Sequence, residues 1–189
     1  MIEVRIHGRG GQGSVVLAEL LATAAWEEGK YSQAFPYLGG GGERRGAPVQ
    51  AFARMSDKRI RTRCRVQIPD YVIVQDVALI GVVDVTRGMR EGGLMLLNAD
   101  SLPPGLGDCG TGIRLCAVPA GRAAAERTGR ALTNTAMLGA FARATGELSL
   151  ESVLSAVRLK FAGDLRAINE EAVRAGYCAA GQSGEGDGR

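Results

Sequence analysis

The spacing that most clearly points to chemistry lies in a glycine-rich turn near the start of the chain, Gly8-Arg9-Gly10-Gly11-Gln12-Gly13. Its glycines at positions 8, 10 and 13 satisfy G-x-G-x-x-G, a turn that lets a phosphate approach bare backbone and directs helix N–H groups at an anion. A dinucleotide site also needs an acidic residue about 20 positions later, at the end of the second strand. Glu27 and Glu28 instead fall at the end of the predicted helix, and the second strand ends in Gln33-Ala34-Phe35-Pro36. The turn alone therefore favours close helix–strand packing with an anion contact over a complete NAD or FAD site.

A second group of residues is a set of arginines that alternate along one stretch of chain: Arg59, Arg61, Arg63 and Arg65. If this stretch is a strand, all four side chains share one face, and Ile60, Cys64 and Val66 point the other way. Arg44, Arg45 and Arg54 could join them. A solvated strand face, docking of an acidic partner and binding of a phosphorylated ligand all fit this pattern. Aromatic residues do not interleave with the arginines, which disfavours nucleic acid.

No nucleophile or metal-ligand constellation accompanies these groups. The one histidine, His7, sits beside the glycine turn, and the sequence has no Gly-x-Ser-x-Gly elbow. Four scattered cysteines form no Cys-x-x-Cys pair: Cys64, Cys109, Cys116 and Cys178. We interpret them as buried, reduced thiols of a cytoplasmic protein. Neither a catalytic residue nor an iron–sulfur or zinc site is expected in this chain.

The elements around the turn predict an α/β fold with a Rossmann-like, doubly wound and mostly parallel sheet. A first strand begins at Ile2 and runs into the glycine turn, a helix follows over Val15–Trp26, and Gly29 ends it. Further strands are expected at Tyr31–Phe35 and Tyr71–Asp76. Between them, Val49–Met55 and Arg59–Val66 predict a β-hairpin insertion.

The second half of the chain predicts two more strands and then a helical C-terminal part. Ala78–Met89 is expected to form a crossover helix, and Gly93–Asn98 and Ile113–Val118 the strands. The later helices are expected at Arg122–Thr128, Asn134–Thr145, Leu150–Phe161 with Ser149 as N-cap, and Asp164–Ala175. Residues 1–180 are then one folded domain, and the polar residues 181–189 a disordered tail.

Composition narrows the function classes. The 189 residues suit one domain, and the net charge of +3 is too small to imply nucleic acid by itself. No stretch reaches the roughly 20 apolar residues that span a bilayer. The N-terminus alternates charged and apolar residues, unlike a signal peptide, so we expect a cytoplasmic protein without a membrane partner.

Five segments, taken in order, resemble the gamma subunit of the 2-oxoacid:ferredoxin oxidoreductases, most closely the pyruvate or branched-chain 2-ketoacid type. They are His7–Gly13, Gly29–Pro36, Glu43–Val49, Ile68–Asp76 and Asn134–Ala140. Each segment alone is a weak signal, but five in the right order are specific, and the resemblance covers roughly residues 1–176. One departure is the run Gly39–Gly42, because the family's loop before Glu-Arg-Arg-Gly is usually shorter.

The resemblance implies a role inside a larger enzyme. Such enzymes oxidatively decarboxylate a 2-oxoacid on thiamine diphosphate, pass electrons through 4Fe–4S clusters to ferredoxin and transfer the acyl group to coenzyme A. The chain is expected to pack against alpha, beta and ferredoxin-like delta subunits, which hold those cofactors, and to be inactive alone. Its expected contribution is to help to hold coenzyme A through Gly8, Arg9, Gly10, Gly11, Gln12, Gly13, Glu43, Arg44 and Arg45. An interface left exposed in the isolated chain could lead to self-association.

Two other interpretations remain open. A free-standing Rossmann-type nucleotide-binding oxidoreductase is opposed by the missing ribose acid, and a binding module unrelated to 2-oxoacids is opposed by the five ordered segments. The particular 2-oxoacid is not readable from this chain. Pyruvate is favoured only because Glu43–Pro48 resembles the pyruvate-type version.

Overall fold

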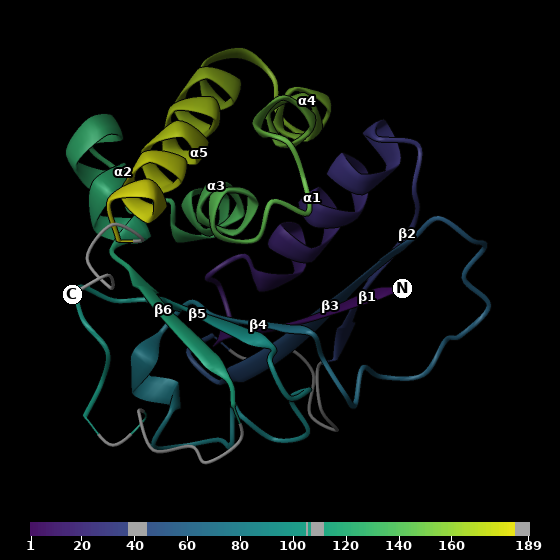
Figure 1. Cartoon of the computed structure of the whole chain (residues 1–189). Coiled ribbons are helices and arrows are strands. Elements are labelled where there is room, and N and C mark those ends of the chain that lie inside the picture. Colours follow the sequence, from purple (N-terminus) through teal and green to yellow (C-terminus); the bar gives the residue numbers. More distant parts are fainter. Residues whose placement is uncertain (38–44, 105, 107–111, 184–189) are drawn as a thin grey trace.

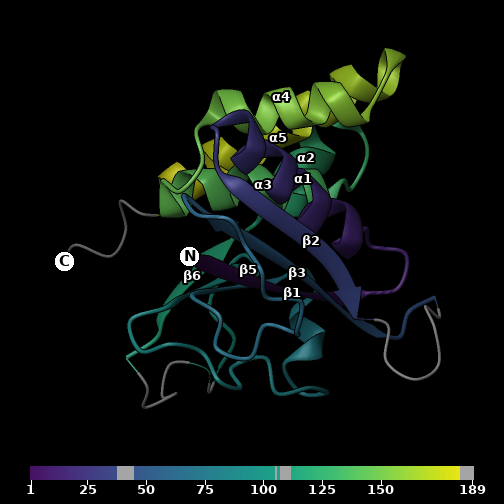
Figure 2. The same ribbon diagram turned by 90° about the vertical axis from the view of Figure 1, so that its right-hand side faces the viewer.

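A computed structural model describes residues 1–37, 45–104, 106 and 112–183. Helices cover one face of a six-stranded sheet, and mostly irregular chain covers the other (Figure 1). The view turned by 90° shows the same two layers about the sheet (Figure 2). The strands are β1 (Ile2–Arg9), β2 (Tyr31–Tyr37), β3 (Pro48–Ser56), β4 (Tyr71–Val74), β5 (Leu94–Asn98) and β6 (Arg114–Val118). The helices are α1 (Ser14–Glu27), α2 (Ala120–Thr128), α3 (Thr133–Thr145), α4 (Leu150–Lys160) and α5 (Gly163–Ser183), with a 3₁₀ turn at Val77–Leu79.

The sheet is mixed, with strand order β2-β3-β1-β4-β5-β6. From β1 to β6 the strands are parallel, whereas β3 pairs antiparallel with both β1 and β2. Since β3 reverses direction relative to each neighbour, β2 runs parallel to β1 but lies one strand away from it. The predicted α/β class and the strand–turn–helix–strand opening are confirmed, and the sheet gains an antiparallel N-terminal region.

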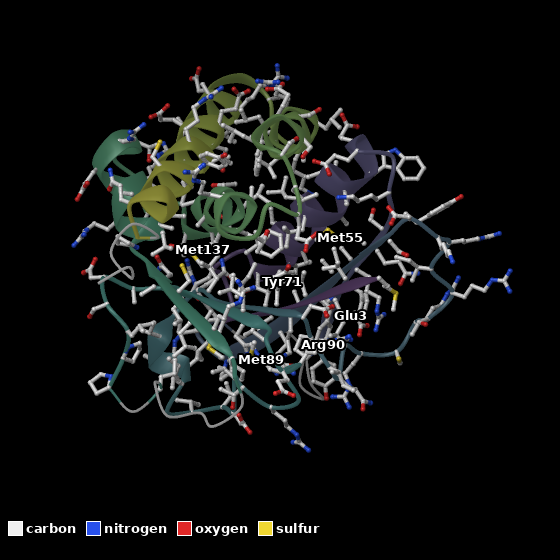
Figure 3. All side chains as sticks on the ribbon, viewed as in Figure 1. Glu3, Met55, Tyr71, Met89, Arg90 and Met137 are labelled. Atoms are coloured by element: carbon white, nitrogen blue, oxygen red, sulfur yellow. The ribbon has the colours of Figure 1, made fainter. Side chains whose placement is uncertain are left out.

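The two faces of the sheet are read directly from residue alternation in β4 and β5. Ile73 and Leu96 belong to the large core beneath the helices, whereas the neighbours Val72, Val74 and Met95 belong to a smaller core on the opposite face. Figure 3 shows the same division: Met137 of α3 lies between the sheet and the helices, and Met89 lies on the other side. The parallel strands are therefore buried on both faces, which explains their continuous apolar sequence.

The predicted hairpin between Val49–Met55 and Arg59–Val66 is wrong. The observed hairpin joins β2 to β3, so that β1 and β2 occupy both edges of β3 and leave none for a further strand. The segment from Asp57 to Ile68 is irregular. Two buried or half-buried side chains hold it instead of a ladder: Arg54 donates to the Cys64 carbonyl at 2.7 Å, and Gln33 donates to the Ile60 carbonyl at 3.4 Å.

The alternating arginines consequently share no strand face, although Arg59, Arg61, Arg63 and Arg65 are all exposed. Arg54 does not join them, because it is 1% exposed and forms an ion pair with Glu3 at 2.7 Å. The predicted burial of the cysteines is also wrong for two of them: Cys64 and Cys178 are exposed, and Cys116 is half-buried. Cys109 lies outside the described residues.

The predicted crossover helix over Ala78–Met89 is also wrong, since only the 3₁₀ turn at its start is helical. Val83 and Val85 pack into the smaller core, and their β-branched side chains lower the helix propensity of this stretch. Gly88 has a φ of +69°, and a Cβ there would overlap the Gln67 carbonyl. The chain therefore crosses this face of the sheet as tightly held coil.

The later strands and helices match their predicted positions except at the C-terminus, where the last helix runs eight residues past its predicted end at Ala175 and includes residues 181–183 of the expected tail. Ser149 is the N-cap of α4 as predicted, and its hydroxyl accepts from the Ser152 N–H at 3.1 Å. Gly29 follows α1 with a φ of +78°, as expected for a helix-ending glycine. Helix α5 continues through Ser183, and residues 184–189 of the expected tail lie outside the described residues. None of the described helices is long and apolar enough to cross a membrane.

Helices α3 and α5 cross at two glycines. A Cβ at Gly176 would overlap the Ala136 carbonyl, and one at Gly139 would overlap the Val173 carbonyl. The two backbones therefore approach closely only because neither position has a side chain.

We predict that Gly176→Ala destabilises the protein, because the added methyl group meets backbone that cannot rotate away. Overpacking of this kind costs about 1–3 kcal/mol, which exceeds the helix-propensity gain of about 1 kcal/mol. Chemical denaturation of the full chain measures the loss. Gly81→Ala is the matched control, because a Cβ there meets nothing within 4 Å. Equal midpoints for the two variants would contradict the close crossing.

Glu28 links α1 to the start of α4. Its carboxylate accepts from the Ser149 N–H at 2.7 Å and the Ser152 hydroxyl at 2.8 Å, and it pairs with Lys30. Burial alone would raise the pKa of Glu28, but these hydrogen bonds outweigh it and lower the pKa from 4.5 to about 2.

We therefore predict an acid limb of stability that depends on Glu28. A carboxylate with a lowered folded pKa contributes stability above its unfolded pKa and loses it as the pH falls through the folded value. The window here runs from about pH 4.5 down to about pH 2. Glu28→Gln should flatten urea-unfolding stability across that window. Glu27→Gln is the control, because among the described residues the Glu27 carboxylate accepts only from the half-buried Ser155 hydroxyl, at 2.6 Å. An unchanged acid limb in Glu28→Gln would refute this role.

Candidate anion-binding site at the glycine turn

The carboxyl ends of β1, β4, β5 and β6 meet at one edge of the sheet because these strands are parallel. The glycine turn follows β1 there, Gln75 and Asp76 follow β4, and Asn98 ends β5. The chain leaves β1 toward β2 on one side and leaves β4 toward β5 on the other. The switch point between β1 and β4 is where open α/β sheets bind ligands.

The turn is closed by its own side chain and backbone. The Arg9 N–H donates to Oε1 of Gln12 at 2.7 Å, and the Gln12 N–H donates to the Arg9 carbonyl at 2.9 Å. Gly11 and Gly13 have φ angles of +92° and +73°, which L side chains rarely adopt. Gln12 is therefore a structural part of the turn, which explains an otherwise atypical residue in this pattern.

Gln75 joins the turn to its neighbours. Its Oε1 accepts from the Ser14 hydroxyl at 2.5 Å, its Nε2 donates to the Gln12 carbonyl at 3.3 Å, and its own carbonyl accepts from Asn98 at 3.1 Å. Gly8 makes room for this arrangement, since a Cβ there would lie 2.6 Å from Oε1 of Gln75. The first glycine of the motif thus permits side-chain approach rather than a tight turn.

Arg9 is fixed by Asp76. Its Nε lies 2.6 Å from the Asp76 carboxylate, and its Nη1 donates to the Gly46 carbonyl at 3.1 Å. Burial alone would raise the pKa of Asp76, but the hydrogen bonds from Arg9 and the Ala78 N–H outweigh it and lower the pKa. The carboxylate therefore stays charged and holds Arg9 against the turn.

Arg45 reaches the turn through the start of β3. The Gly10 N–H donates to the Ala47 carbonyl at 2.9 Å, and the Gly46 N–H donates back to Gly10 at 3.0 Å. The exposed Arg45 side chain lies beside Gly11, where a Cβ would be 3.8 Å from its Cγ. Of the predicted site residues, the structure brings Arg45 and the turn from Gly8 to Gly13 together. Glu43, Arg44 and the run Gly39–Gly42 lie outside the described residues.

Helix α1 begins at this turn without a side-chain cap. Gly13 occupies the N-cap position, and no side chain among the described residues accepts from the first turn. The N–H groups there carry the positive end of the helix dipole. Together with Arg45, they form a surface that suits an anion.

The strand order argues against a dinucleotide site at this turn. Strand β3 lies between β1 and β2, so the carboxyl end of β2 is about 10 Å from β1 at a strand spacing of about 4.8 Å. Glu28 is bound to α4, and Glu27 accepts from Ser155 on the same helix. Neither acid faces the turn.

Sequence reasoning missed four residues that shape this edge. Gln75, Asp76 and Asn98 hold the turn, and Asn134 packs against it, 2.6 Å from where a Cβ on Gly13 would lie. A polar pair directly after a β-branched strand was the available signal for Gln75 and Asp76. Asn134 begins one of the five family-like segments, but no local signal assigned it to this site, because its contact spans 121 positions of sequence.

His7 is 1% exposed and lines a small pocket with Leu79 and Val83. Burial and then the nearby Arg5 charge lower its pKa to about 3, partly opposed by Asp84. It is therefore neutral at physiological pH. Within the described ranges, no group of three or more His, Cys, Asp or Glu side chains is placed to hold a metal ion.

The fold is that of a Rossmann-like α/β protein. Its glycine turn, held by residues from several segments of the chain, is a candidate anion site. A family model described as pyruvate ferredoxin/flavodoxin oxidoreductase matches residues 3–179, and the chain belongs to this family. It is 48% identical over 181 residues to pyruvate synthase subunit PorC of Methanothermobacter marburgensis, covering 94% of this chain and 96% of that one. It is 44% identical over 187 residues to the pyruvate/ketoisovalerate oxidoreductases common subunit gamma of Thermococcus kodakarensis, with coverage of 94% and 96%.

Solved structures agree with this assignment. Pyruvate oxidoreductase subunit PORC of Thermotoga maritima superimposes with a TM-score of 0.81 at 36% identity, covering 94% of this chain and 96% of that one. A 2-oxoglutarate:ferredoxin oxidoreductase of Magnetococcus marinus shares the fold, with a TM-score of 0.76 at 19% identity, over 96% of this chain and 31% of that one. The resemblance of the five segments to the gamma-subunit type is thereby confirmed.

We predict that Gly13 and Asn134 are energetically coupled. Gly13→Ala forces a side chain into a left-handed conformation, which costs roughly 1–2 kcal/mol, and also drives its methyl group into the Asn134 amide. In an Asn134→Ala background only the backbone term remains, so the cost of Gly13→Ala should fall. Thermal or urea unfolding of all four chains gives the coupling, expected at about 0.5 kcal/mol or more. The same cost in both backgrounds would contradict this contact.

Proposed function

We propose that this chain is the gamma subunit of a multi-subunit 2-oxoacid:ferredoxin oxidoreductase acting on pyruvate or a related 2-oxoacid. The observation that supports it best is the sequence identity of 48% to a pyruvate synthase subunit PorC and of 44% to a pyruvate/ketoisovalerate oxidoreductase gamma subunit, each along 94% of the chain. Its partners would be alpha, beta and ferredoxin-like delta subunits in the cytoplasm. The isolated chain, with residues 1–180 as its folded domain, would be inactive and could self-associate.

Within that complex, the glycine turn would help to hold the phosphates of coenzyme A, which is a substrate of the acyl-transfer step. Three features support this role: the uncapped start of α1, the exposed Arg45 and the ion-paired Arg9. Phosphate oxygens accept both backbone N–H and guanidinium donors. The family resemblance assigns Glu43 and Arg44 to the same role, and both lie outside the described residues.

As the family resemblance implies, the partner subunits would hold thiamine diphosphate and the iron–sulfur clusters. A 4Fe–4S cluster takes four thiolates, and the described residues contain no group of three or more metal-binding side chains. This chain would contribute binding surface rather than bond-making groups.

We predict that Arg45→Ala in the assembled enzyme raises the KM for coenzyme A. Losing one charge-assisted contact to a phosphate typically weakens binding by tenfold or more. The KM for the 2-oxoacid and kcat at saturating coenzyme A should change little, because Arg45 would contact coenzyme A and not the 2-oxoacid. Steady-state kinetics of ferredoxin reduction measures all three. Arg44→Ala is expected to act in the same direction.

Arg61→Ala is the matched control, since it removes the same charge from an exposed position in irregular chain. It should leave the KM for coenzyme A unchanged. Equal effects of Arg45→Ala and Arg61→Ala would indicate general electrostatic attraction, and no effect of Arg45→Ala would reject the coenzyme A role.

A further inference from the structure

A cavity of about 510 Å³ lies on the face of the sheet opposite the helices. Its floor comes from side chains of β1 and β3 that point away from the large core, Arg5, Gln50 and Phe52. Its walls come from the irregular segments 65–68 and 84–88. The volume is in the range of small-molecule sites, and none of the lining residues belongs to the glycine-turn site.

A hydrogen bond, an ion pair and close backbone packing hold the walls of the cavity in place. Arg90 donates its N–H to the Pro69 carbonyl at 3.1 Å and pairs with Asp70 at 2.9 Å, which ties the second segment to the first. Gly88 lies directly on the Gln67 backbone. Arg90 appears beside this face in Figure 3. The cavity is therefore preorganised although its walls are coil.

The lining is strongly basic. Arg5, Arg65 and Arg87 line the cavity with one acid, Asp84, and none of these arginines forms a salt bridge in the described part of the chain. Asp84 accepts from the Thr86 N–H and hydroxyl at 3.1 and 2.8 Å and also attracts Arg5, so one negative charge faces three positive ones. The excess charge is left for a ligand.

Arg5 is the deepest of these groups. It is 6% exposed, donates through Nη2 to the Val85 carbonyl at 3.0 Å, and has no partner for Nε among the described residues. An unpartnered donor on a buried cation is costly, and oxygen ligands of an anion would satisfy it. At the rim, the Arg65 guanidinium lies 4.4 Å from the centre of the Tyr37 ring, which restrains it.

We propose that this cavity binds a small oxyanion compound, a phosphate or polycarboxylate, through Arg5, Arg65 and Arg87. The ligand occupies a site separate from the glycine turn and on the other face of the sheet. An acidic side chain of a partner protein is less suited, because it would fill only a small part of the volume and leave the rest hydrated.

The test is a titration of the ¹⁵N-labelled full chain with pyrophosphate and, separately, with citrate, followed by amide resonances. The probe that binds should cause saturable chemical-shift changes at the Gln67 and Gly88 amides. Comparison of the two dissociation constants shows whether the cavity prefers a phosphate or a carboxylate compound. Arg87→Gln and Arg65→Gln should each raise the dissociation constant by about tenfold or more. Both side chains are exposed, so neither variant threatens the fold.

Arg63→Gln is the control, because Arg63 is exposed on the same segment but does not line the cavity. It should change the dissociation constant by less than a factor of about three. Equal weakening by Arg63→Gln would mean diffuse attraction and would overturn the proposal. So would shifts confined to Gly11 and Gly13, or no saturable shift with either probe. If Arg87→Gln instead blocks assembly with the partner subunits while neither probe binds, the cavity is a protein-docking site and the proposal is wrong.

Discussion

The insertion of β3 between β1 and β2 is the constraint on which the rest of this molecule depends. A strand has two edges, and β3 uses both, so β2 is displaced one position from the strand that carries the glycine turn. The acid that a dinucleotide site would place at the end of β2 is therefore out of reach. Instead, the residues just before β3 place Arg45 and Gly46 beside the turn. The insertion of β3 thus removes the position of a ribose-binding acid from the turn and places the basic residue Arg45 there.

The same insertion shapes the opposite face. Alternate residues of β3 point away from the helices, and one of them is Arg54, which is a buried cation. Such a charge requires partners, and it takes the Glu3 carboxylate, the Cys64 carbonyl and the Phe35 ring at 5.2 Å. These contacts fix the irregular chain after β3 across the sheet. The basic cavity exists because that chain is held as a wall instead of continuing the sheet.

Local signals predicted the elements that depend on local energetics. Apolar period, a serine N-cap and a helix-ending glycine were enough for α1, α4 and the strands of the parallel half. The Arg59–Val66 strand was predicted wrongly because its alternation is typical of a strand, but β1 and β2 already occupy both edges of β3, the strand with which it was expected to pair. The Ala78–Met89 helix failed because tertiary packing of its valines into the smaller core outweighed helical spacing.

The candidate site was predictable only in part, for a similar reason. The motif located the turn and its arginines, since these are adjacent in sequence to a recognisable strand. Gln75 and Asn134 contact the turn across about 60 and 120 residues of sequence, and Asn98 bonds Gln75 across 23, so only the three-dimensional fold reveals them. Gly8 belongs to the predicted turn, and its role in the structure is to admit Ser14 and Gln75 rather than to turn the chain.

The distribution of charge shows why the small net charge of +3 says little about binding. In the helical layer, three arginines form ion pairs: Arg122 with Asp100, Arg127 with Glu171, and Arg158 with Glu151 and Glu170. Within the described residues, Arg45, Arg87 and the arginines of the irregular segment have no such partners. The positive potential is therefore concentrated at the carboxyl edge of the sheet and on its coil-covered face. Anionic ligands and partners would meet the molecule there, and the helical layer would stay electrostatically neutral toward them.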